Sequence, residues 1–191
     1  ILAASHALNR CGVTSSQTDD LLAFNNVPYE RVLEAYRELE AEGRMTVRVY
    51  EQSQFTTLKD LKGFLEKGYH TGWGTPWFKI GPLKMLGDGS LGARSAYLSR
   101  PYADNPSTCG IPIFTREQFE EMVGYANSHG MQVAIHAIGD GILDDILAAY
   151  EKALKECPRP DHRHGIVHCQ ITRPDQLRKF EELSLHAYIQ S

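Results

Sequence analysis

The sequence lacks the features that would place it in a membrane, in a disulfide scaffold or on nucleic acid. No apolar stretch approaches the roughly 20 residues needed to cross a bilayer, and no basic region precedes an apolar core at the start of the chain. Four cysteines lie far apart without a Cys-x-x-Cys pair, which argues against a disulfide framework and against a zinc knuckle. The formal net charge is −4, too small to favour nucleic acid or a membrane surface as a partner. We therefore expect a cytoplasmic protein with reduced thiols.

What is present is an alternation of strand-like and helix-like patterns in a chain of 191 residues, 42% of them hydrophobic. The strand patterns cover residues 12–20, 45–52, 78–86, 132–138, 165–169 and 183–190. Helical patterns lie between them at 28–43, 57–68, 115–129, 141–157 and 174–183. A strand that recurs after each helix, at a spacing of roughly 30 residues, predicts a parallel sheet.

Two architectures contain such a sheet, an open doubly wound sheet and a (β/α)8 barrel. The first strand is not followed by the glycine fingerprint that binds phosphate in doubly wound folds. Polar residues at the ends of successive strands favour the barrel, because catalytic groups collect there in that fold. The irregular segment 87–114 is too long for a plain connection, so we expect a functional loop.

Three residues that could share a metal site lie at or near the ends of apolar strands: Lys84, His136 and His168. Imidazole is a common ligand of divalent metals, whereas a lysine can join only after conversion to an anionic group such as a carbamate. Strand alternation predicts that all three point into the barrel, Lys84 together with Leu86 and His168 together with Ile166. The structural alternatives are a solvated lysine and buried histidines that are satisfied by backbone carbonyls.

Four further residues flank this expected site. Asp88, Ser90 and Arg94 lie in the long loop, where they could contact substrate, although a turn-forming Asp-Gly pair explains Asp88 equally well. Asp140 is most simply the N-cap of a helix. It could also orient the ring of His136, because a metal-bound imidazole usually donates its other N–H to an acceptor.

Three segments carry a family resemblance: LKMLGDGSLGARSAYLSRPYADNP (83–106), GMQVAIHAIGDGILDDILAAYE (130–151) and RHGIVHCQ (163–170). Together they resemble the YtcJ-like branch of the metal-dependent amidohydrolase superfamily, amidohydrolase family 3. The resemblance implies a (β/α)8 barrel with a small β-sandwich, and hydrolysis of C–N bonds in a small-molecule substrate with one or two divalent metals, zinc foremost. It also implies that Lys84 is the carboxylated lysine of the fourth strand, and that His136 and His168 are the ligands of the fifth and sixth strands.

Several parts of the family pattern are missing. The first-strand His-x-His pair and the eighth-strand aspartate, the general base, are absent, and Val167 replaces the glutamate usual before the sixth-strand histidine. The only His-x-His, His162 with His164, lies in a polar connection. We therefore expect residues 1–191 to form one truncated domain that contains about strands two to seven and lacks the first and eighth strands and the terminal β-sandwich.

Such a fragment would hold an incomplete metal site. We expect it to bind metal weakly or not at all, to be inactive alone, and to self-associate through its open sheet edges. The intact enzyme would act on amides, formamides or cyclic amides. The rival hypothesis is a non-catalytic scaffold derived from a degenerate barrel.

Overall fold

A single parallel sheet organises the structure, a computed structural model that describes residues 1–22 and 27–190. Its six strands follow one another in chain order: β1 (Ser15–Thr18), β2 (Arg48–Gln54), β3 (Phe78–Leu86), β4 (Val133–Ala137), β5 (Gly165–His168) and β6 (His186–Tyr188). The helices are α1 (Leu2–Arg10), η1 (Asp20–Leu22), α2 (Tyr29–Ala41), α3 (Leu58–Glu66), α4 (Arg116–Ser128), α5 (Asp140–Glu156) and α6 (Pro174–Glu182). Each strand pairs in parallel with the next, which leaves β1 and β6 as the two edges.

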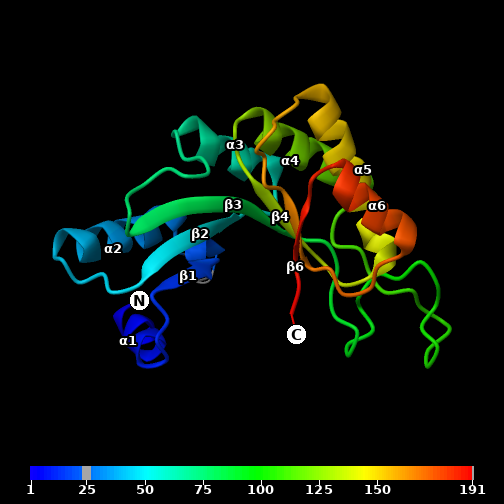
Figure 1. Cartoon of the computed structure of the whole chain (residues 1–191), viewed down its shortest axis with the longest axis horizontal. Helices are drawn as coiled ribbons and strands as arrows, with labels where there is room; N and C mark the ends of the chain where they lie inside the picture. Colours follow the sequence, from blue (N-terminus) through cyan, green and yellow to red (C-terminus); the bar gives the residue numbers. More distant parts are fainter. Residues whose placement is uncertain (23–26, 191) are drawn as a thin grey trace.

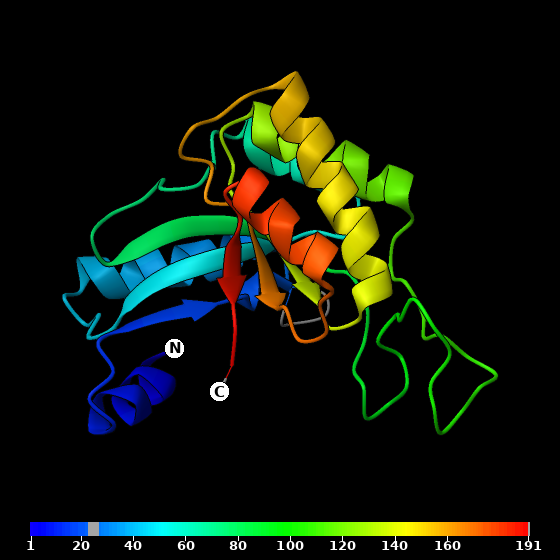
Figure 2. The same cartoon turned by 45° about the vertical axis from the view of Figure 1, so that its right-hand side comes forward.

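The sheet is curled, and helices α3, α4 and α5 stack on one side of it (Figures 1 and 2). A sequential parallel sheet with helices on its outer side is part of a (β/α)8 barrel. The prediction of a partial barrel is therefore confirmed, with six strands in the described residues.

Every strand and helix predicted from the sequence is present, with ends shifted by a few residues. One local difference is at the first strand, which ends at Thr18 and is followed by the short helix η1. The predicted capping box of α4 is confirmed: the Thr115 side chain accepts from the Gln118 backbone, and the Gln118 side chain accepts from the Thr115 backbone. Within residues 1–22 and 27–190, no helix is both long and apolar enough to span a bilayer.

Strand alternation divides the sheet into a helix-covered face and an inner face. On β4, Val133 and Ile135 are fully buried in the core beneath the helices. The intervening Ala134 and His136 therefore lie on the inner face. Lys84 is paired with Ala134 and Leu86 with His136, and partners in adjacent strands share a face. The carboxyl-terminal end of the inner face thus carries Lys84 and His136, as predicted.

Candidate metal centre

His136 and His168 meet at the carboxyl-terminal edge of the sheet. Their ring centroids are 4.6 Å apart, with the rings edge to face at 80°. His136 lies near the end of β4 and His168 ends the neighbouring strand β5. Because parallel strands end at the same edge, two histidines 32 positions apart in the sequence become neighbours.

His168 reaches this position through its backbone conformation and not through strand alternation. Ile166 is paired with Ile135 and fully buried beneath the helices, so the prediction that Ile166 shares the inner face is wrong. Strict alternation would send His168 to that same helix-covered face. Instead the backbone enters the left-handed region at His168 (φ 73°) and Cys169 (φ 48°), where alternation ends. Such conformations are strained for residues other than glycine and concentrate at functional sites.

In each ring, one nitrogen lies within hydrogen-bond distance of an acceptor oxygen of the protein. The Nε2 atom of His136 lies 2.9 Å from the carbonyl oxygen of Gly89 and 3.2 Å from Oδ1 of Asp88. The Nδ1 atom of His168 lies 2.7 Å from Oε1 of Gln190. When one ring nitrogen donates to a protein acceptor, the other carries the lone pair that binds metals. These contacts leave Nδ1 of His136 and Nε2 of His168 as the candidate donor atoms for a metal.

Lys84 lies one step earlier on the same inner face, since its partner Ala134 precedes His136 by two residues. Two residues along a strand span about 6.6 Å. The lysine is only 8% exposed. Burial lowers the pKa of its amine, and the charge of Asp19 partly opposes that shift. A lowered pKa raises the fraction of neutral amine, which is the form that can react with carbon dioxide.

The structure separates the loop residues that the sequence grouped together. Asp88 is buried against His136. Ser90 is exposed, and the exposed Arg94 forms an ion pair with Asp104 at 2.6 Å. Asp140 accepts from the backbone and hydroxyl of Ser99 and pairs with Arg173 at 3.0 Å. The carboxylate that lies beside His136 is thus that of Asp88, where the sequence suggested Asp140.

Two of the contacts that the histidines make could not be predicted from the sequence. Gln190 follows a short edge strand and reaches His168 across 22 positions of the chain. The carbonyl of Gly89 belongs to the backbone, which residue type does not reveal. For Asp88, the signal was its position four residues after Lys84, at the point where the chain leaves the strand.

The donor set suits a divalent transition metal but is incomplete in this chain. Two imidazole nitrogens and a buried amine of lowered pKa are the groups that such a cation accepts, once the amine is converted to an anion. Within residues 1–22 and 27–190, no three side chains of the His, Cys, Asp or Glu type are grouped closely enough to hold a metal. A catalytic zinc usually has three protein ligands, and the two histidines supply only two.

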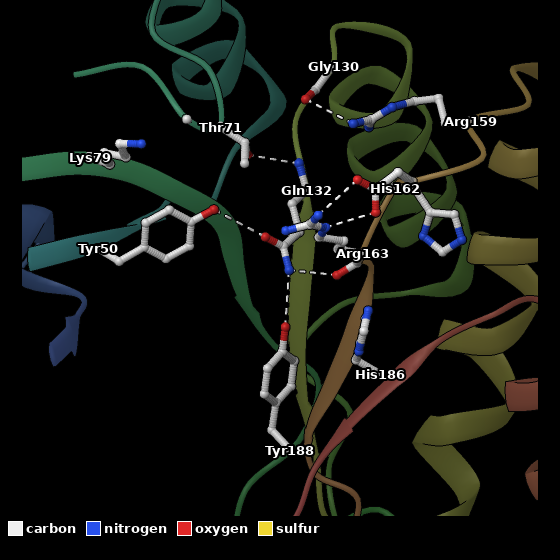
Figure 3. Close-up of a pocket in the computed structure, with 12 residues that line it drawn as sticks. Tyr50, Thr71, Lys79, Gly130, Gln132, Arg159, His162, Arg163, His186 and Tyr188 are labelled. Atoms are coloured by element: carbon white, nitrogen blue, oxygen red, sulfur yellow. Dashed lines mark hydrogen bonds and ion pairs between the residues drawn. The ribbon is translucent and has the colours of Figure 1, made fainter. Parts of the chain in front are cut away.

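A polar cavity of about 570 Å³ lies at the opposite, amino-terminal end of the strands (Figure 3). Gln132 lies near its centre and donates from Nε2 to the Arg163 carbonyl at 2.6 Å and to the Tyr188 hydroxyl at 3.0 Å. Its Oε1 accepts from the Tyr50 hydroxyl at 3.4 Å. These groups satisfy one another, and catalytic groups of this fold lie at the other end of the strands. We interpret the cavity as a polar layer of the barrel interior.

A curled parallel sheet with two imidazoles and a buried lysine at its carboxyl-terminal edge is typical of the class of metal-dependent hydrolase barrels. Comparison with known proteins agrees with this class. The chain belongs to the amidohydrolase family, whose sequence profile matches residues 1–191.

Its relatives include proteins of bacteria, archaea and plants. The chain is 30% identical over 167 residues to the amidohydrolase-type protein YtcJ of Bacillus subtilis (strain 168), covering 84% of this chain and 28% of YtcJ. It is 35% identical over 136 residues to LONG AFTER FAR-RED 3 of Arabidopsis thaliana, covering 71% of this chain and 22% of that protein. A crystal structure of an uncharacterized metal-dependent hydrolase from Pyrococcus furiosus superimposes with a TM-score of 0.80 at 33% identity, covering 98% of this chain and 36% of that one. The chain thus spans about a quarter of the curated relatives it matches.

Proposed function

We propose that this chain supplies the central metal-binding strands of a hydrolase that cleaves non-peptide C–N bonds in amides, formamides or cyclic amides. The observation that carries the proposal is the pair His136 and His168, with ring centroids 4.6 Å apart at the carboxyl-terminal edge of the sheet. Membership in the amidohydrolase family supports the hydrolase class, and the bond type is our inference from that class.

The residues of the chain have distinct roles in this proposal. His136 through Nδ1 and His168 through Nε2 hold one divalent cation, with zinc expected first. Lys84, as a carbamate formed when its neutral amine adds to carbon dioxide and releases a proton, joins this set and allows a second ion. Bound metal would supply Lewis acidity for the substrate carbonyl and lower the pKa of a water molecule. Asp88 and the Gly89 carbonyl keep the His136 ring in place.

We further propose that the chain by itself is inactive, because two imidazoles and a lysine leave the cation short of ligands and the eighth-strand aspartate, the general base of the family, has no counterpart in this sequence. The loss of a general base alone lowers a rate by about 10²-fold to 10⁴-fold. The first-strand histidines and the eighth-strand aspartate would come from the remainder of the barrel. If that remainder lacks them, the alternative of a non-catalytic scaffold gains support.

The open edges of the sheet suggest how the chain behaves on its own. The edge strands β1 and β6 each present backbone groups to which another strand can pair. We propose that the isolated chain self-associates through these edges. A separate proposal is that the whole protein acts in the cytoplasm. Size-exclusion chromatography with light scattering tests self-association, and a monomer at all concentrations would contradict it.

Cobalt binding tests the metal site without reliance on turnover. Titration of this chain with Co²⁺ in the presence of bicarbonate should give weak, saturable visible absorption, which His136→Ala and His168→Ala each remove. His6→Ala is the matched control, because His6 is exposed on α1, far from β4 in the sequence. Absorption that survives loss of both site histidines would overturn the assignment of the site.

Activity is tested on the whole protein. A protein that extends this chain in both directions should hydrolyse members of a panel of formamides, N-acyl amines and cyclic amides with Zn²⁺, Co²⁺ or Mn²⁺. This activity should disappear in His136→Ala and persist in His6→Ala. Turnover by the isolated chain at the rate of the whole protein would contradict the proposed incompleteness, and a whole protein inert on the entire panel would favour the scaffold.

A further inference from the structure

Asp88 is the carboxylate in contact with His136, and it accepts three hydrogen bonds from the backbone. It is 2% exposed and lies just beyond β3. Its Oδ2 accepts from the backbone N–H of Tyr97 and of Gly139, each at 2.8 Å, and its Oδ1 accepts from that of Ile138 at 3.1 Å. The Asp88 side chain therefore connects the end of β3 with the end of β4 and with the part of the long loop that contains Tyr97.

The packing around this carboxylate leaves it little freedom. A Cβ atom added to Gly139 would lie 2.0 Å from the Tyr97 carbonyl oxygen, so only glycine allows the loop to approach the start of α5 this closely. The backbone N–H groups of Gly141 and Ile142 donate to the same Tyr97 carbonyl at 3.0 and 3.1 Å. The position of the Asp88 carboxylate is thus fixed from three directions.

Both protein neighbours of the His136 Nε2 atom are acceptors, namely Oδ1 of Asp88 at 3.2 Å and the Gly89 carbonyl at 2.9 Å. A neutral imidazole carries one hydrogen, and an unprotonated Nε2 would place its lone pair against two other lone pairs. The hydrogen therefore belongs on Nε2. Gly89 is the residue next to Asp88, so the hydrogen bonds that fix Asp88 also fix the second acceptor.

We propose that Asp88 is a positioning residue that holds His136 as the Nε2–H tautomer and so leaves Nδ1 as the free donor atom beside His168. The inference deepens the proposed function, on which it rests for the identity of the cation. It gives Asp88 a role toward the metal ligand, different from the substrate contact or the simple turn that the sequence suggested.

The first test uses the unaltered chain and needs no metal. Long-range ¹H–¹⁵N spectra of the histidine rings, recorded about two pH units above the ordinary histidine pKa of about 6.5, distinguish the two neutral tautomers. His136→Gln identifies the His136 signals by their disappearance. We expect Nε2 to show the protonated ¹⁵N shift and Nδ1 the unprotonated one. A predominant Nδ1–H tautomer in the unaltered chain would overturn the inference, even if every variant of Asp88 failed to fold.

The second test uses Asp88→Asn, which keeps the size of the side chain but offers one acceptor oxygen to three backbone donors. We expect its His136 signals to show a mixture of tautomers and its Co²⁺ affinity to fall by about 10-fold to 100-fold, as for other residues that orient a metal ligand. Asp104→Asn is the matched control, because Asp104 lies in the same loop and is exposed in its pair with Arg94. Circular dichroism establishes that each variant is folded. A folded Asp88→Asn with an unchanged tautomer and unchanged affinity would overturn the inference.

The two proposals fail in different ways. An Nε2–H tautomer of His136 in a chain that never binds Co²⁺ would support the role of Asp88 and count against the metal function. Binding of Co²⁺ through His136 with an Nδ1–H tautomer in the free chain would support the metal site and overturn the role of Asp88.

Discussion

Glu51 should weaken the folded state at neutral pH, and Glu51→Gln should relieve this effect. The residue lies on the helix-covered side of β2 and is fully buried. In the described part of the chain neither carboxyl oxygen has a hydrogen-bond partner. Burial raises the pKa of Glu51 to about 9, and the negative charge of Asp20 adds to the shift. The backbone amides of Asp20 and Leu21 approach the carboxyl group without meeting hydrogen-bond geometry, and they oppose the shift only in part.

The size of the effect follows from proton linkage. The folded protein keeps a proton on Glu51 up to pH about 9, whereas the unfolded chain releases it near pH 4.5. Folding therefore takes up a proton between these values, and stability falls as the pH rises through this window. At about 1.4 kcal/mol per pH unit, the free energy of unfolding is lowered by roughly 3 kcal/mol at pH 7. Glutamine has the shape of the protonated acid and does not ionise.

Urea denaturation of the two proteins between about pH 5 and pH 8 measures the difference. We expect Glu51→Gln to be the more stable protein, with an advantage that grows by about 1.4 kcal/mol per pH unit. Glu38→Gln, at an exposed position of α2, should change stability by less than about 0.5 kcal/mol at every pH. A Glu51→Gln protein whose stability relative to the unaltered chain does not change with pH would refute this reasoning.

Three further predictions concern buried residues on the sheet or packed against it. Burial lowers the pKa of His164 to about 3. Below pH about 6.5 the unfolded chain therefore takes up a proton that the folded chain excludes, which destabilises the unaltered chain but not His164→Gln. In urea titrations, the difference in free energy of unfolding by which His164→Gln falls below the unaltered chain should shrink by about 1.4 kcal/mol for each pH unit of acidification. Tyr150→Phe removes a buried hydroxyl that bonds the carbonyls of two strands, and it should lower the free energy of unfolding by about 1–3 kcal/mol, whereas Tyr125→Phe should have little effect. Lys84 should remain an unmodified amine in the isolated chain, because binding of metal is what retains a carbamate. Native mass spectrometry that detects one added CO₂ on the metal-free chain would contradict that expectation.

The sequence alone determined the succession of elements. Apolar alternation in β4 and the spaced apolar residues of α5 are local patterns, and a recurring βα unit has few ways to bury them. The capping box at Thr115 and Gln118 is also local, so its prediction is confirmed at the level of individual hydrogen bonds. The likeness of three segments to one family identified Lys84, His136 and His168 as candidates.

Tertiary structure decided how these candidates meet. Alternation placed His168 beside Ile166, but left-handed backbone at His168 turns its ring toward His136. Asp88 and Asp140 are both aspartates next to a glycine, and each could have been the partner of His136. Hydrogen bonds to Tyr97, Ile138 and Gly139 bring Asp88 to the ring, while Ser99 and Arg173 hold Asp140 away. These contacts join residues 9 to 51 positions apart, and local patterns in a single sequence carry no information at such distances.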